Sequence, residues 1–132
     1  MFEGFKPVNL AIGLPSISIT SNGVAFSKAA IIKMEKTEHV VLMINELDKQ
    51  VAVQKCAPDD ANATQFYKMD KRIVSVRWNN KDFLNTLSKM MNWNLEEEGY
   101  KVYGEFYSDE VALVFDLKTA QIIDGKADNE DA

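Results

Sequence analysis

Residues 17–26, which read Ile-Ser-Ile-Thr-Ser-Asn-Gly-Val-Ala-Phe, decide the fold because they describe a strand, a turn and a second strand. Residues 17–20 alternate apolar and polar side chains, as a half-buried strand does. Residues 21–23 supply the turn, since Asn-Gly tolerates the positive φ that a tight hairpin needs. Residues 24–26 can then pair back, so the chain is predicted to contain an antiparallel hairpin here.

The hairpin is followed by a short helix and a second hairpin. Ser27 is a suitable N-cap for a helix that places Ala30, Ile31 and Met34 on one face. Residues 39–45 and 51–55 are β-rich runs joined by a polar pentapeptide, which predicts another antiparallel pair.

The same order of elements recurs later in the chain. Residues 73–78 predict a strand. Asn79 or Asn80 can cap a helix over residues 80–95, and Gly99, which lies beyond the helix, can terminate it. Its apolar residues recur at helical spacing, which makes it the main amphipathic helix: Phe83, Leu84, Leu87, Met90 and Met91. Residues 100–107 and 111–117 predict the last hairpin.

The recurrence predicts an internal duplication. Residues 24–28 align with 76–80 at an offset of 52, and residues 40–53 align with 100–113 at an offset of 60. The eight extra residues fall in the longer second helix. We therefore expect an α+β fold of two βαββ-like halves, forming a pseudo-two-fold, mostly antiparallel sheet or partly closed barrel. The alternative is that βαββ, a common local order, arose twice independently.

Length and charge predict one domain. A chain of 132 residues suits a single domain, which we assign to residues 1–123, with half-repeats at 17–55 and 73–117 and a linker at 57–71. The net charge is −5, and much of it lies in residues 124–132, which predict an acidic, disordered tail.

Several classes of function find no support in the sequence. The single histidine, His39, and the single cysteine, Cys56, cannot make a structural zinc site, and no phosphate-binding glycine loop occurs. A Cys56–His39 thiolate pair lacks an orienting third residue. We therefore expect a non-enzymatic protein without metal or cofactor. The lone cysteine suits a reducing cytoplasm, and no stretch has the ~20 apolar residues of a membrane span.

One stretch concentrates positive charge in this acidic protein. Residues 66–81 hold five of its cations against one acid, and both arginines of the chain are among them. Such cations can neutralise phosphates while neighbouring aromatic rings stack on bases. The candidate nucleic-acid contacts are Lys68, Lys71, Arg72, Arg77 and Lys81, with Tyr67 or Trp78 for stacking. The alternative is that these cations protect an edge strand from aggregation.

Trp93 stands apart from the apolar stripe of the second helix. It is a candidate interface residue, either closing the core or contacting a protein partner. Met90 and Met91, in contrast, fit the stripe and are assigned to the protein's own core.

The first half resembles the swapped-hairpin domain of AbrB/SpoVT-type transcription regulators. The similarity lies in residues 17–19, 23–28, 29–34, 40–44 and 51–53, and the second half matches only in the order of its elements. The resemblance implies a DNA-binding topology that a duplicated chain could complete alone. Ser27 and residues 37–38 depart from the family pattern, and the first hairpin lacks the family's arginines, so no functional residue is carried over.

These observations favour a small nucleic-acid-binding or regulator-like protein, acting as a monomeric pseudo-dimer or a homodimer on DNA or RNA. One alternative is a protein-interaction module or complex subunit that uses an exposed sheet edge and Trp93. A further alternative is an enzyme whose site is assembled between the two halves.

Overall fold

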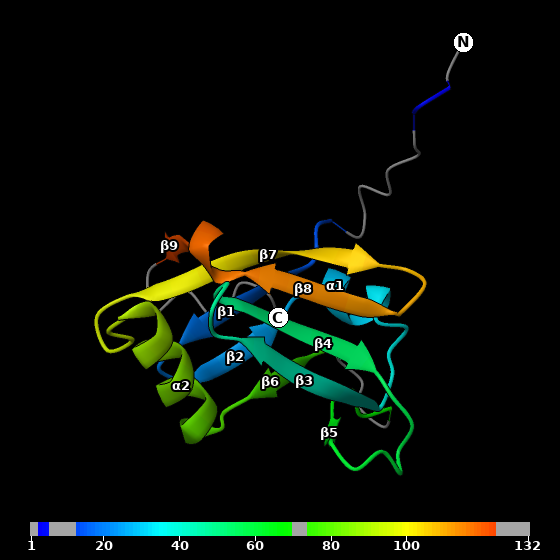
Figure 1. The fold of residues 1–132 in the computed structure, drawn as a ribbon, viewed down its shortest axis with the longest axis horizontal. Coiled ribbons are helices and arrows are strands. Elements are labelled where there is room, and N and C mark those ends of the chain that lie inside the picture. Colours follow the sequence, from blue (N-terminus) through cyan, green and yellow to red (C-terminus); the bar gives the residue numbers. More distant parts are fainter. Residues whose placement is uncertain (1–2, 6–12, 70–73, 124–132) are drawn as a thin grey trace.

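A computed structural model describes residues 3–5, 13–69 and 74–123 (Figure 1). The predicted tail at 124–132 lies outside these ranges. The elements in chain order are β1 (Ser16–Thr20), β2 (Gly23–Phe26), α1 (Lys28–Lys33), β3 (His39–Asn45), β4 (Gln50–Lys55), β5 (Ala63–Gln65), β6 (Val76–Trp78), α2 (Lys81–Met91), β7 (Gly99–Tyr107), β8 (Ala112–Asp116), a 3-10 turn η1 (Leu117–Thr119) and β9 (Gln121–Ile123).

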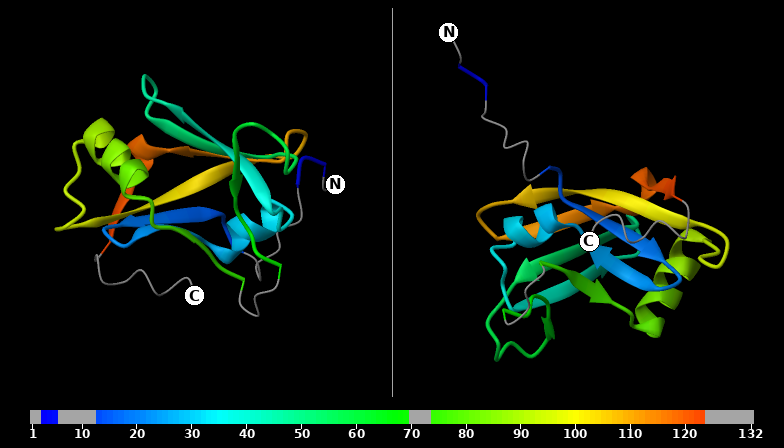
Figure 2. Two further views of the ribbon diagram at one scale, coloured as in Figure 1. Left: turned by 90° about the horizontal axis from the view of Figure 1, so that it is seen from below. Right: turned by 180° about the vertical axis from the view of Figure 1, so that it is seen from behind.

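The strands form one antiparallel sheet that curls into a half-barrel. Their order is β5-β3-β4-β8-β7-β1-β2-β6, and β9 pairs with the first residues of β7 on the edge opposite β1. Viewed from below in Figure 2, the sheet bends back so that β5 and β6, its two end strands, approach each other. The Trp78 indole on β6 donates a hydrogen bond to the Gln65 carbonyl on β5 at 3.2 Å. The two ends of the sheet are thus linked by a side chain rather than by strand pairing.

The long strand β7 makes the corner of this sheet. Its first part pairs with β1, and from Gly104 onward it pairs with β8. A Cβ atom at Gly104 would lie 2.6 Å from the Phe115 ring, which is fully buried and faces this glycine across the strands. The absence of a side chain at Gly104 therefore lets Phe115 fill the inside of the bend.

The two helices lie at opposite ends of the half-barrel (Figures 1 and 2). The short α1 buries Ala29, Ala30 and Ile31, and α2 buries Phe83, Leu84 and Leu87. These residues join the inward side chains of the strands in one apolar core that includes Ile17, Ile19, Val40, Val53, Val102, Leu113 and Phe115.

Much of the predicted local structure is confirmed. Ser27 caps α1 by accepting a hydrogen bond from the Ala30 amide at 3.1 Å, and Asn80 caps α2 in the same way from the Phe83 amide at 3.0 Å. The hairpins β1–β2, β3–β4 and β7–β8 all form, and the α+β class with a mainly antiparallel sheet is correct.

Other predicted boundaries are wrong. The linker at 57–71 contains a strand, β5, because residues 63–65 pair with the edge of β3. The second helix ends at Met91 rather than near residue 95, since Asn92 adopts a left-handed conformation with φ of 57° and ψ of 43°. Gly99, predicted as a helix terminator, instead begins β7. The strand predicted at 73–78 is formed only from Val76 onward in the described residues.

Within the described residues, no helix has the length and apolar character needed to cross a membrane.

Candidate nucleic-acid interface

The described cations of the basic stretch are all accessible to solvent. Lys68 precedes β6, Arg77 lies in β6 and Lys81 begins α2, and each side chain is exposed. Lys71 and Arg72, the other two candidate phosphate contacts, lie outside the described residues. The accessible part of the predicted site therefore follows β6 into the first turn of α2.

The two aromatic residues predicted to stack on bases have other roles. Tyr67 is only 5% exposed and packs in the core, so little of its ring is accessible to a base in this structure. Trp78 is half-buried, and its ring meets those of Phe26, Phe66 and Phe83 edge-on at centroid distances of 5.0, 6.2 and 6.2 Å. Because Trp78 also bonds to Gln65, its main role here is to hold the two end strands together.

The structure instead brings Lys81 together with Trp93. Both line a pocket of about 300 Å³ between α2, the loop that follows it and the β1–β2 turn. The remaining lining residues are mostly amides and hydroxyls: Ser21, Leu84, Asn85, Ser88, Asn94, Leu95 and Glu96. Two residues that the sequence offered as separate candidates, one for phosphate and one for an interface, therefore share one cavity.

The loop after α2 fixes the position of Trp93. The left-handed Asn92 turns the chain sharply, after which the Trp93 amide donates to the Ser88 carbonyl at 2.9 Å. The Asn94 side chain then accepts a hydrogen bond from the Glu96 amide at 3.1 Å. These local bonds hold the indole beside the helix instead of letting it extend the apolar stripe.

Trp93 is also supported by an aromatic neighbour. Its ring stacks on that of Tyr100 with centroids 4.0 Å apart and planes 10° from parallel. The Tyr100 hydroxyl donates to a Glu98 carboxylate at 3.1 Å. Burial, followed by this carboxylate, raises the pKa of Tyr100 above its ordinary value. The stack fixes the indole as a flat wall of the pocket.

The pocket contains residues that were not predicted from the sequence. Lys81, Asn85 and Ser88 are spaced i, i+4 and i+7 along α2, so they form one polar stripe on the helix. That spacing is visible in the sequence and could have identified the helical wall. The contribution of Ser21 could not have been found in this way, because it comes from a turn sixty residues before Lys81.

A larger cavity, of about 580 Å³, lies near the start of β3 and the end of β4. It is lined by Thr37, Glu38, His39, Lys55, Cys56, Ala57 and Pro58. Desolvation, with a smaller effect of the Asp60 carboxylate, raises the pKa of the Cys56 thiol. A nucleophilic cysteine needs the opposite shift. Within the described residues there is also no group of three or more His, Cys, Asp or Glu side chains that could hold a metal ion.

Comparison with known proteins identifies no relative: no protein-family model matches the chain, and neither a curated protein nor a solved structure is significantly similar to it.

Proposed function

We propose that this protein binds nucleic acid along β6 and the start of α2, with an unpaired nucleotide entering the pocket beside Trp93. The observation that carries the proposal is that Lys81 and Trp93 line one polar pocket of about 300 Å³. A cation can neutralise a phosphate, an indole can stack on a base, and amide and hydroxyl groups can bond to base edges.

The cations outside the pocket support a path for the backbone of a bound strand. Arg77 and Lys68 are exposed on β6 and on the segment before it, so they offer further positive charge to the phosphates of a bound strand. Arginine suits this role because its planar guanidinium can bond to two phosphate oxygens. Trp78 would act indirectly by holding β6 in position.

The proposal includes a duplicated architecture. The order of elements supports it: β1-β2-α1-β3-β4 is followed by β5-β6-α2-β7-β8. The pairing between the two units is reciprocal, since β3 pairs with β5 and β7 pairs with β1, while β2 pairs with β6 and β4 with β8. A two-fold axis between the units would produce this exchange of partners.

The strand registers give the same support. Ala25 pairs with Arg77, and these two residues are related by the offset of 52 in the sequence alignment of the halves. Val53 pairs with Leu113, which are related by the offset of 60. In a pseudo-dimer within one chain, corresponding strands of the two halves pair antiparallel, and corresponding residues lie opposite each other at the centre of each pair.

Oligonucleotide titrations at several salt concentrations test the proposed function. We expect a labelled single-stranded oligonucleotide to bind more tightly than a duplex of the same sequence, with affinity that falls as salt rises. Lys81→Glu should weaken binding by about tenfold or more, because it replaces attraction to phosphate with repulsion.

Lys28→Glu is the matched control. Lys28 is also exposed and is also the first residue of its helix, but it lies at the other end of the half-barrel. This variant should change the net charge equally and leave the affinity nearly unaltered. Equal weakening by both variants would indicate a general charge effect, and binding that is absent even at low salt would refute the proposal.

A further inference from the structure

The edge of β3 is open along half of its length. β5 pairs with its first three residues, His39, Val40 and Val41, and β4 covers the opposite side of the strand. On the β5 side, residues 42–45 have no strand partner in the described part of the chain. This segment reads Leu-Met-Ile-Asn and spans roughly 13 Å as a strand.

The hydrogen-bonding groups on this edge can be assigned from the neighbouring pairs. The Glu38 carbonyl accepts from the Phe66 amide on the β5 side at 2.7 Å, and the His39 carbonyl accepts from the Cys56 amide on the β4 side at 3.2 Å. Backbone groups alternate between the two sides of a strand. Leu42 and Ile44 therefore direct their N–H and C=O groups to the open edge.

The open segment lacks the usual protection of a strand edge. It contains no lysine or proline, and Met43 and Ile44 are 41% and 36% exposed. Leu47, at the tip of the β3–β4 hairpin, is 90% exposed. The hairpin is nevertheless held in place, because the Lys49 ammonium donates to the Met90 carbonyl of α2 at 3.1 Å.

The corresponding part of β7 is covered by the chain itself. There Ile17 and Ser16 of β1 pair with Val102 and Tyr103, and the Gly104 amide donates to the Pro15 carbonyl at 2.9 Å. β1 is longer than β5, which is why one edge is covered and the other is not. β1 on the edge of β7 therefore shows the kind of segment that the open edge of β3 can accept. It is an antiparallel strand whose isoleucine, Ile17, points into the core.

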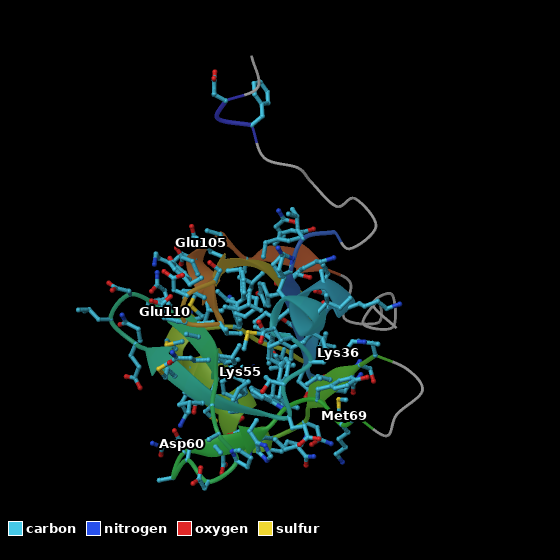
Figure 3. All side chains as sticks on the ribbon, turned by 90° about the vertical axis from the view of Figure 1, so that its right-hand side faces the viewer. Lys36, Lys55, Asp60, Met69, Glu105 and Glu110 are labelled. Atoms are coloured by element: carbon cyan, nitrogen blue, oxygen red, sulfur yellow. The ribbon has the colours of Figure 1, made fainter. Side chains whose placement is uncertain are left out.

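Exposed carboxylates lie near both ends of the position that an added strand would occupy beside β3. A strand antiparallel to β3 and in line with β5 would start near Glu46 and Asp48 and finish near Asp59 and Asp60. All four side chains are exposed, and none forms an ion pair within the described residues. In Figure 3, Asp60 lies at the lower side of the molecule, away from Glu105 and Glu110. A bound strand would therefore be favoured by basic residues at both of its ends.

We propose that the open edge of β3 binds an extended segment of a protein partner by strand addition, with apolar residues at alternate positions and basic residues at both ends. The main-chain bonds of Leu42 and Ile44 would hold the segment, and the acidic ends would fix its position. This interaction is distinct from the proposed nucleic-acid binding, because none of residues 42–45 lines the pocket beside Trp93.

A designed peptide tests this proposal on the full chain. The probe is Ser-Ile-Ser-Ile, the sequence of residues 16–19, flanked by two lysines on each side and labelled for fluorescence polarisation. We expect saturable binding that slows hydrogen exchange at the amides of Leu42 and Ile44. Ile44→Lys should weaken binding by about tenfold, since a charged edge opposes strand addition.

Two controls distinguish strand addition from general adhesion. Ile122→Lys makes the same substitution at an isoleucine that is 64% exposed on β9, and it should leave peptide affinity unchanged. A peptide with N-methyl groups on the edge that would face β3 should bind at least about tenfold more weakly, because it lacks the amide donors. Oligonucleotide binding by Ile44→Lys should equal that of the unaltered protein.

Three results would overturn the proposal. One is equal binding of the methylated and unmethylated peptides. Another is peptide binding without exchange protection at Leu42 and Ile44. The third is a protein that sediments as a dimer, does not bind the peptide and becomes a monomer when Ile44→Lys is introduced. A second copy of the chain would then occupy the edge.

Discussion

The two ends of the half-barrel are closed by helices that begin alike and end differently. α1 and α2 both start with an exposed lysine after a capped turn. α1 then ends after six residues and is followed by a five-residue connection to β3, whereas α2 runs for eleven residues and is followed by a seven-residue loop before β7. The pocket beside Trp93 lies between that longer helix and that loop.

The difference indicates that one end of the half-barrel mainly fills the core, whereas the other end also carries a pocket. At the α1 end, Ala30, Ile31 and Met34 are completely buried, so this end of the half-barrel mainly contributes to the core. At the α2 end, the helix also carries a polar stripe of Lys81, Asn85 and Ser88, none of which is buried. The predictions below test whether the α1 end acts only in stability and the α2 end in binding.

The largest effect is expected at the α1 end. Ile31→Ala should lower the free energy of unfolding by about 2–5 kcal/mol, because it removes buried methylene and methyl groups and leaves a cavity. Urea denaturation provides the measurement. Ile32→Ala, at the half-buried neighbouring position, should cost clearly less. Neither variant should change oligonucleotide affinity while the protein is folded, and a change with Ile31→Ala would remove the distinction between the ends.

The helix caps should differ in the same direction. The Ser27 hydroxyl accepts hydrogen bonds from the amides of both Ala30 and Ser16, at 3.1 and 3.0 Å, and both contacts are buried. Ser27→Ala would leave a second buried donor unpaired, so we expect a loss of about 2–3 kcal/mol. Asn80→Ala removes one partly buried bond and should cost about 1 kcal/mol. Equal losses in thermal unfolding would show that the second contact of Ser27 adds nothing.

The helix ends predict a smaller effect of opposite sign. Lys36, just after α1, has a φ of 51°, and Asn92, just after α2, has a φ of 57°. Left-handed conformations strain lysine more than asparagine. Lys36→Gly should therefore stabilise the protein by about 0.5–1 kcal/mol, whereas Asn92→Gly should be nearly neutral. Stabilisation of similar size at both positions in chemical denaturation would contradict this.

The smallest effect concerns pH at the α2 end. The folded state raises the pKa of Tyr100, so the neutral phenol stabilises the fold below the ordinary pKa of about 10. This contribution is lost as the pH rises through the folded pKa. Ionised Tyr100 should also quench its stacked neighbour Trp93, so we expect tryptophan fluorescence to fall in this range. Tyr100→Phe should abolish the transition, whereas Tyr103→Phe, at an exposed tyrosine, should preserve it.

The sequence predicted those features of the fold that depend on neighbouring residues. Ser27 and Asn80 cap their helices because an N-cap acts on amides three residues away. The three hairpins follow from alternation and turn residues in the same way. β5 and β9 could not be predicted, because each has three residues and exists only through pairing with a strand distant in the sequence, β3 or β7.

The candidate site was predicted in part. Lys68, Arg77 and Lys81 are exposed as expected, but Tyr67 is in the core. An aromatic residue in a basic stretch gives no sign of which way its ring points when the stretch is not a regular strand. The association of Lys81 with Trp93 depends on the turn at Asn92 and on the stack with Tyr100, which are features of the folded chain.

The pairing of β1 with the distant strand β7 also affects the order in which the protein can fold. Ile17 pairs with Val102, about 85 residues later, so the edge of β1 that faces away from β2 has no partner until β7 has been made. At a synthesis rate of about 5–20 residues per second, this strand waits roughly 4–17 s. Pairing over such separations is slow even in a complete chain. The first hairpin, apolar on its inner face, must therefore remain unassociated for seconds, and this interval is when a nascent chain would most need a chaperone.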